Sequence, residues 1–254
     1  MQNRYFIQLS FNGHAYHGWQ IQENAITVQE TLNTCLKTFL RDDINVLGAG
    51  RTDTGVHASY FMAHFDISTK IEDKGLFLNK INKLLPPDIA VQNIFKVSNE
   101  ANARFDAISR TYEYRIHNEK NPFLNQFSWY NRISLDLDKM NKAASFLFNY
   151  EDFTSFSKLG TQVATNNCRI MEAIWIKTSN NLIFRIKADR FLRNMVRAIV
   201  GTLIEVGLSK IDEYEFCDII EKKDRCLAGF SVPAHGLFLT NIEYPDGLLQ
   251  PFAE

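Results

Sequence analysis

Hydrophobic and polar residues alternate in several short runs along the chain, and a period of two predicts β-strands. In the run 4–11, for example, Tyr5, Ile7, Leu9 and Phe11 fall on one face. Other runs are rich in β-branched and aromatic residues, which favour strands. The predicted strands are residues 4–11, 44–47, 60–67, 89–97, 109–117, 170–177, 182–188 and 236–244.

Other segments repeat their hydrophobic positions at the 3.6-residue period of an α-helix. The best marked one begins at Thr27, which forms a capping-box pattern with Glu30. Another is stopped by the pair Pro86-Pro87, because proline cannot continue a helix. The predicted helices are residues 27–40, 76–85, 134–150, 189–206 and 212–223.

Both halves of the chain share a coarse order of strand, helix and strand, without a clear sequence repeat. Residues 99–106 have the composition of a connector. We therefore expect a boundary there, between an N-terminal domain 1–104 and a C-terminal domain 105–254. Residues 179–181, Ser-Asn-Asn, are expected to form the turn of a hairpin in the second domain.

The composition is that of an ordinary globular protein, with 254 residues of which 45% are hydrophobic. The four cysteines contain no C-x-x-C pair, which argues against zinc and disulfides and favours reduced structural thiols. The N-terminus lacks the uninterrupted apolar core of a signal peptide, and no apolar run is long enough to span a membrane. We therefore expect a cytoplasmic protein.

The net charge of −1 does not suggest a nucleic-acid binder, unless positive charge is concentrated on one surface. Such a concentration occurs between residues 185 and 197, where Asp189 is the only acidic residue. In the predicted helix 189–206, three of the cations lie within about 60° of one another. Arg197 lies where this stripe meets apolar residues, so it needs a carboxylate or phosphate partner. The five cations are Arg185, Lys187, Arg190, Arg193 and Arg197.

The segment 50–58, G-R-T-D-T-G-V-H-A, is predicted to be a loop between two strands, a common place for reactive groups. Three interpretations of its residues are open. Asp53 could cap the backbone of its own turn. The glycines resemble the start of a phosphate-binding loop, although Asp53 occupies the third glycine position. Asp53 and His57 could also form an acid/base pair.

The order of residues in this segment closely resembles the signature loop of the tRNA pseudouridine synthase A family, in which the aspartate is catalytic. Three further segments resemble motifs of that family and occur in the family's order over nearly the whole chain. Asn12 is a departure, since many members have aspartate there. The further segments are R-T-Y-E-Y at 110–114, F-L-R-N-M-V-R at 191–197 and P-A-H-G-L at 233–237.

The resemblance implies an α/β (α+β) fold of two pseudo-symmetric halves that share a mixed, mostly antiparallel sheet flanked by helices. The active-site cleft would lie between the halves. It also implies a homodimer that grips tRNA and isomerises uridines at positions 38 to 40 of the anticodon arm. The alternative function is a non-catalytic RNA-binding protein that retains the cleft.

The reaction breaks the C1′–N1 glycosidic bond, turns the uracil and joins C1′ to C5. No atoms or electrons are gained, so neither a cofactor nor a metal is required. By resemblance, Asp53 is the catalytic nucleophile or base, and Arg197 is the guanidinium beside it. Tyr112 would stack on the flipped uracil, while Arg51 would fill the gap in the RNA or hold a phosphate. A metal-free hydrolase using Asp53 and His57 is a third possibility.

Overall fold

The computed structural model describes residues 2–158, 160, 165–178 and 181–250 of the chain. Over these residues the chain forms nine β-strands and five α-helices. Among the strand pairs described below, that of β5 and β6 is parallel, and the other five are antiparallel. A mixed, mostly antiparallel sheet flanked by helices was predicted, and this α/β class is confirmed. The predicted hairpin turn includes residues 179 and 180, which lie outside the described residues.

The chain divides into two compact units. Unit 1 consists of Met1–Ile108 and Leu239–Glu254, and unit 2 consists of Ser109–Phe238. In unit 1, β1 lies between β3 and β4 and pairs with both, while β2 pairs with β3. The elements that lie wholly in unit 1 are β1 (Asn3–Phe11), η1 (Gly13–Ala15), α1 (Val28–Leu40), β2 (Leu47–Gly48), β3 (His57–Ile67), α2 (Lys74–Leu84) and β4 (Ile89–Val97).

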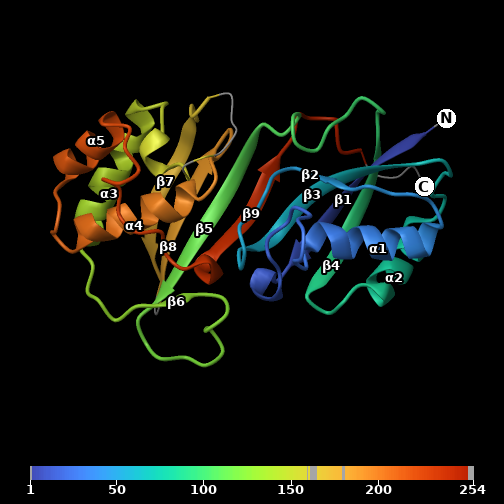
Figure 1. Ribbon diagram of the computed structural model, residues 1–254, viewed down its shortest axis with the longest axis horizontal. Coiled ribbons are helices and arrows are strands. Elements are labelled where there is room, and N and C mark those ends of the chain that lie inside the picture. Colours follow the sequence, from blue (N-terminus) through green and yellow to red (C-terminus); the bar gives the residue numbers. More distant parts are fainter. Residues whose placement is uncertain (1, 159, 161–164, 179–180, 251–254) are drawn as a thin grey trace. The chain divides into compact units, whose positions relative to one another are not determined.

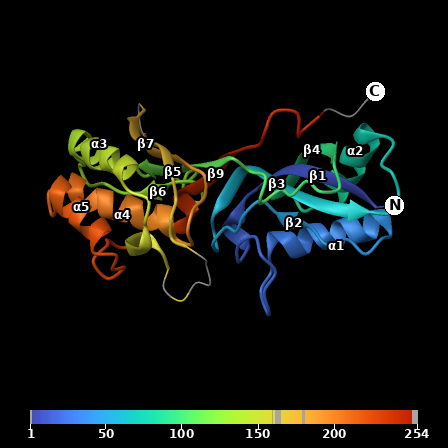
Figure 2. The ribbon, with the colours of Figure 1, turned by 90° about the horizontal axis from the view of Figure 1, so that it is seen from above.

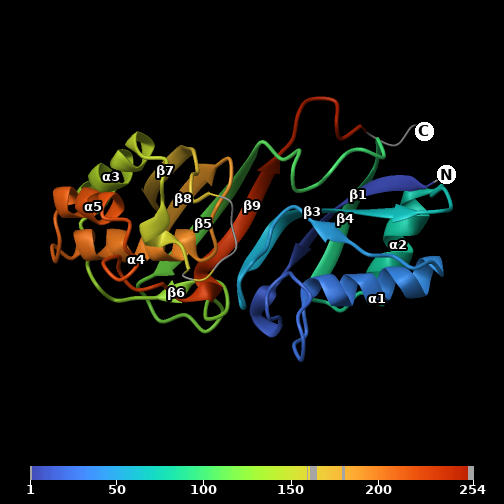
Figure 3. The ribbon, with the colours of Figure 1, turned by 45° about the horizontal axis from the view of Figure 1, so that its top comes forward.

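The helices of unit 1 begin at polar caps and pack together. Thr27 is the N-cap of α1, as predicted, and its hydroxyl accepts the backbone N–H of Glu30 at 3.3 Å. Asp73 caps α2 in the same way. The two helices lie side by side (Figure 3), and the ring centroids of Phe39 and Phe77 are 5.5 Å apart.

The segment before the candidate loop differs from the predicted strand 44–47, because pairing with β3 involves only Leu47 and Gly48. Val46 is buried all the same, and side chains of α1 satisfy its backbone. Asn33 Oδ1 accepts the N–H of Val46 at 2.9 Å, and Gln29 Nε2 donates to its carbonyl at 2.6 Å. Two helix side chains thus replace the neighbouring strand that an extended segment would otherwise need.

In unit 2, β8 lies between β5 and β7, and β6 adds to β5. The three helices of this unit group beside β7 and β8 (Figures 1 and 2). Trp175 of β7 and Phe184 of β8 form part of the core, with ring centroids 5.0 Å apart. The remaining elements are β5 (Ser109–His117), β6 (Trp129–Tyr130), α3 (Leu137–Ser145), η2 (Phe146–Asn149), η3 (Thr154–Phe156), β7 (Ile170–Lys177), β8 (Asn181–Ala188), α4 (Met195–Gly207), α5 (Glu213–Glu221), η4 (Ala234–Gly236) and β9 (Leu237–Glu243), the last of which runs on into unit 1.

Helix α4 starts six residues later than the predicted helix 189–206. Its N-cap is Asn194, whose φ of 67° is left-handed, so the residues before it cannot continue the helix. Arg190 and Arg193 therefore precede the helix. The predicted helical stripe that joined them to Arg197 is wrong.

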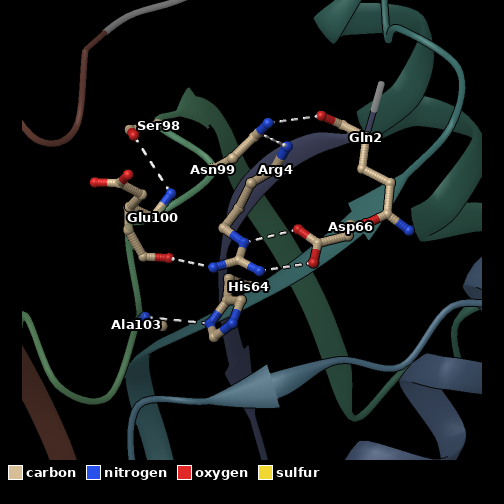
Figure 4. Close-up of polar contacts among 9 residues, drawn as sticks. Gln2, Arg4, His64, Asp66, Ser98, Asn99, Glu100 and Ala103 are labelled. Atoms are coloured by element: carbon tan, nitrogen blue, oxygen red, sulfur yellow. Dashed lines mark hydrogen bonds and ion pairs between the residues drawn. The ribbon is translucent and has the colours of Figure 1, made fainter.

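A polar cluster in unit 1 holds the segment that follows β4 (Figure 4). Arg4 donates from Nε and Nη2 to the two carboxylate oxygens of Asp66, both at 2.7 Å, and from Nη1 to the carbonyl of Ala101 at 2.9 Å. The N–H of Ala103 donates to Nδ1 of His64 at 3.2 Å. Two strands thus fix residues 101–103, which we call the anchored segment.

Because His64 is buried, the pKa of its imidazole lies well below the ordinary value of 6.5, at about 4. The Arg4 guanidinium also lowers this pKa, while the carboxylates of Asp66 and Asp106 oppose the shift. The unfolded chain therefore takes up a proton before the folded protein does. The resulting loss of stability begins as pH falls through about 6.5 and is complete near 4.

We expect the free energy of unfolding to fall over this window, by at most about 1.4 kcal/mol per pH unit. Denaturant unfolding of the wild type and of His64→Gln between pH 7.5 and 4.5 tests this. Glutamine keeps an acceptor for Ala103 but does not titrate, so the variant should show a flatter profile. An equal slope in both proteins would assign the pH dependence to other groups. Asp66, whose pKa is lowered by Arg4, contributes only at lower pH.

Candidate active site

The segment with Asp53 is a loop, as predicted, and it enters β3 at His57. Thr54 and Gly55 form a turn in which Gly55 has a φ of 78°, and the N–H of Val56 donates to the carbonyl of Asp53 at 3.1 Å. Asp53 is half-buried. A strand rather than a helix follows the glycines, which contradicts the phosphate-binding interpretation, since that loop opens a helix.

A second segment, residues 12–19, packs against the Asp53 loop. The N–H of Trp19 donates to the carbonyl of Thr52 at 3.4 Å, and the N–H of Gly55 donates to the carbonyl of Tyr16 at 3.2 Å. A Cβ at Gly18 would lie 2.2 Å from the Thr52 carbonyl oxygen, so only glycine fits this approach. No pattern in the sequence predicted that residues 12–19, which we call the supporting segment, would hold the Asp53 loop.

Trp19 and Tyr16 fix the supporting segment in place. The Trp19 ring is buried and stacks on Phe61 of β3, with centroids 4.2 Å apart. The Tyr16 hydroxyl donates to Oδ1 of Asp88 at 2.7 Å. Burial and this carboxylate raise the pKa of the Tyr16 phenol far above its usual range, so it stays protonated. Tyr16 thus links the N-terminus of β4 to the turn at Gly55.

Tyr16→Phe should weaken this support without touching substrate. We expect a loss of about 1 kcal/mol in stability, the usual contribution of one hydrogen bond. The resemblance predicts isomerisation of uridines in tRNA, and we expect the turnover of that reaction to fall by several fold with nearly constant affinity for the RNA, because the Asp53 loop becomes less well positioned. Thermal melts and single-turnover kinetics check this beside Tyr214→Phe, a change at a 66% exposed tyrosine. Equal rates for both variants would remove Tyr16 from this role.

His57 is buried, and its Nδ1 accepts the N–H of Gly13 at 3.0 Å. A backbone donor therefore occupies the nitrogen that an acid/base role would need on that side of the ring. A Cβ at Gly13 would lie 1.9 Å from the carbonyl oxygen of Val56, so the backbone segments at Gly13 and Val56 are in close contact. This geometry gives His57 a structural role and disfavours the Asp53/His57 hydrolase.

In unit 2, Tyr112 lies on β5 opposite Ile186 and is half-buried. Its ring meets that of Phe191 edge to face, with centroids 5.1 Å apart and an interplanar angle of 86°. Tyr114 is fully buried, and its hydroxyl donates to the carbonyl of Pro233 at 2.9 Å. Tyr114 is therefore a core residue whose hydroxyl is hydrogen-bonded.

Arg197 lies in the first turn of α4 and is half-buried. Its Nε donates to the carbonyl of Val232 at 2.7 Å, while the N–H of Val232 donates to the Arg197 carbonyl at 3.3 Å. Gly236 packs against the ring of Tyr114, because a Cβ at Gly236 would lie 2.8 Å from that ring. Contacts made by Tyr112, Tyr114 and Arg197 thus bring the segments 110–114, 191–197 and 233–237 together.

The sequence predicted that the cations of residues 185–197 form one positive field opposed only by Asp189. This prediction is wrong. Arg185 donates from Nε and Nη2 to Oε1 of Glu113, at 3.2 and 3.1 Å, and Glu113 lies directly opposite it on β5. Nη1 of Arg185 also lies 3.8 Å from Oε1 of Glu172 on β7. The prediction overlooked carboxylates that neighbouring strands supply.

The four predicted site residues fall in two places. Arg51, which is exposed, and Asp53 belong to the loop of unit 1. Tyr112 and Arg197 belong to unit 2, where the segments 110–114, 191–197 and 233–237 come together. Among the described residues, no three His, Cys, Asp or Glu side chains gather as a metal site would require. None of the described helices has the length and hydropathy needed to cross a membrane.

Comparison with known proteins identifies the family. A family model described as tRNA pseudouridine synthase matches residues 147–245. The tRNA pseudouridine synthase A of Bacteroides fragilis is 53% identical over 248 residues, which are 97% of this chain and 98% of that protein. That of Bacteroides thetaiotaomicron is also 53% identical, over 96% of this chain and 92% of its own length. The relative from Thermoanaerobacter sp. is 41% identical over 94% of this chain and 98% of its own length. The chain belongs to the tRNA pseudouridine synthase A family.

Proposed function

We propose that this protein is a tRNA pseudouridine synthase that converts uridine to pseudouridine at positions 38 to 40 of the anticodon arm. The observation that carries the proposal is the intact loop 50–58 in a chain that matches its relatives over nearly their whole length. The enzyme is an isomerase, and uracil and ribose are both retained in the product. Because the reaction is balanced without added atoms or electrons, it needs no cofactor.

Asp53 is the proposed catalytic residue. A carboxylate next to C1′ and C6 of the uridine can attack as a nucleophile or act as a base toward the sugar. The supporting segment of unit 1 favours this role, because it holds the Asp53 loop by backbone hydrogen bonds at Thr52 and Gly55. A reactive group held in this way loses little freedom when the substrate arrives.

Tyr112, Arg197 and Arg51 are the proposed substrate-binding residues. Tyr112 has a ring held edge to face by Phe191, and it would stack on the flipped uracil. Arg197 would place its guanidinium beside Asp53 and keep the carboxylate ionised in a site shielded from water. Arg51 is exposed on the loop itself and would fill the gap left in the RNA or bind the flipped nucleotide's phosphate.

The protein would act as a homodimer that grips one tRNA, and it would work in the cytoplasm. Sedimentation of the purified protein with and without tRNA tests the dimer. A species with the mass of one chain under all conditions would contradict it.

The function is tested by incubating the purified protein with an unmodified tRNA transcript and mapping pseudouridine along it. We expect product at positions 38, 39 and 40 when uridine is present there. Transcripts with a single uridine at one of these positions show which are accepted. Tight tRNA binding without any product would instead identify a non-catalytic RNA-binding protein.

A further inference from the structure

The anchored segment leads into an exposed pair of residues, Arg104 and Phe105, in unit 1. Phe105 is 77% exposed, although phenylalanine is usually buried. The guanidinium carbon of Arg104 lies 5.4 Å from the centroid of the Phe105 ring. The pair therefore presents an aromatic surface and a positive charge together.

The backbone around the pair is closed into a tight turn. Asn102 Oδ1 accepts the N–H groups of Arg104 at 2.9 Å and of Phe105 at 3.2 Å. The carbonyl of Asn102 accepts the N–H of Asp106 at 3.0 Å, and its own N–H donates to Oδ2 of Asp106 at 2.7 Å. A turn with four such bonds has few alternative conformations.

The turn is also fixed to the strands and the C-terminal segment of unit 1. Ala103 donates to His64, and Ala101 accepts from Arg4 (Figure 4). The hydroxyl of Tyr244 donates to the carbonyl of Ala103 at 2.6 Å. A lone exposed phenylalanine needs no explanation, but the backbone that leads to this one is fixed at Ala101 and Ala103. Pre-organisation of this kind favours a binding role.

We propose that Arg104 and Phe105 form a stacking platform for an unpaired nucleobase of the RNA substrate, outside the predicted catalytic set. This inference rests on the proposed function, which supplies RNA as the partner. An aromatic ring stacks on any base, and the adjacent guanidinium complements the phosphate backbone. Neither Arg104 nor Phe105 takes part in the chemistry of Asp53. The platform instead fixes the position of the tRNA and contributes to its affinity.

The platform is tested by measuring tRNA affinity for Phe105→Ala, Phe105→Leu and Phe105→Trp. Removing one base stack costs about 1–3 kcal/mol, so we expect alanine to weaken binding by roughly 5- to 150-fold. Tryptophan should restore it, and leucine should not, because leucine keeps the apolar surface without a π-face. Tyr214→Ala is the matched control, since Tyr214 is also an exposed aromatic side chain, at 66%.

Arg104→Ala provides a second readout, because loss of a phosphate contact lowers the salt dependence of binding. The slope of log Kd against log salt should fall by about 0.7 to 0.9. Pseudouridine formation by Phe105→Ala should show a raised KM and a much smaller change in kcat. The melting temperature of Phe105→Ala should match that of the wild type, since Phe105 is largely exposed.

Affinity within twofold of wild type for Phe105→Ala would overturn the platform, and so would full binding by Phe105→Leu. A changed sedimentation coefficient for Phe105→Ala without RNA would also overturn it, because the residue would then serve an association between protein chains. These outcomes differ from failure of the proposed function. In that case the wild type would form no pseudouridine, whatever the behaviour of the Phe105 variants.

Discussion

Asp53→Asn should abolish pseudouridine formation while tRNA still binds with an affinity within about threefold of wild type. Asparagine has nearly the same shape as aspartate, and the carbonyl that accepts the Val56 N–H belongs to the backbone. The loop should therefore keep its conformation. The amide oxygen lacks the charge needed for attack on C1′ or for proton abstraction, so the rate should fall by at least roughly 10⁴-fold.

This prediction is checked by single-turnover kinetics, with mapping of pseudouridine and a parallel binding titration. Asp43→Asn is a suitable control, because the Asp43 side chain is 93% exposed. Retained turnover in Asp53→Asn would remove Asp53 from the mechanism. Loss of tRNA binding together with activity would show that Asp53 serves binding instead.

Gly18→Ala should damage both stability and activity. Gly18 has a φ of 84°, which costs an alanine about 1–2 kcal/mol, and the added Cβ would lie 2.2 Å from the carbonyl oxygen of Thr52. Because that oxygen belongs to backbone, it can move only with the Asp53 loop. We expect a loss of at least about 2 kcal/mol in stability. Turnover should fall by about 100-fold, since a shift of about 1 Å at a catalytic group has such an effect.

Gly50→Ala is the matched control for stability, because a Cβ at Gly50 would meet no atom within 4 Å. Its melting temperature should equal that of the wild type. If Gly18→Ala melts and turns over like the wild type, residues 12–19 do not position the Asp53 loop. A lowered melting temperature with full activity would confine their role to stability.

The strands were largely predictable from the sequence, because alternation and turn residues act locally. The predicted ranges 89–97, 109–117 and 170–177 are those of β4, β5 and β7. Residues 44–46 were predicted as strand because they are apolar, and Ile44 and Val46 are indeed buried. The backbone of Val46 bonds to side chains from α1, however, and no local pattern reveals such a partner.

The start of α4 could not be predicted from periodicity. Hydrophobic spacing continues through residues 189–194, but the backbone there bonds elsewhere. Asp189 Oδ1 accepts the N–H groups of Arg169 and Arg190, at 2.8 and 2.7 Å. Asn194 then adopts the left-handed conformation that begins the helix. An aspartate bonded to Arg169, the residue before β7, and an asparagine at positive φ override the local preference.

The candidate loop was predictable because its residues are specific to one family, and the structure agrees that it joins a short strand to β3. Its support was not predictable. Tyr16 and Asp88 are far apart in the sequence, and nothing in either neighbourhood indicates their hydrogen bond. The pairing of Arg185 with Glu113 was missed for the same reason, since it depends on the register of β5 and β8.

Release of tritium from tRNA that carries 5-³H-uridine tests the central claim most directly, because C5 loses its hydrogen when it becomes bonded to C1′. The purified wild-type protein should release one tritium for each pseudouridine mapped at positions 38 to 40. It should do so in buffer that contains a chelator and no added cofactor. Tight binding of the labelled tRNA without any release of tritium would contradict the assignment of this chain as a pseudouridine synthase.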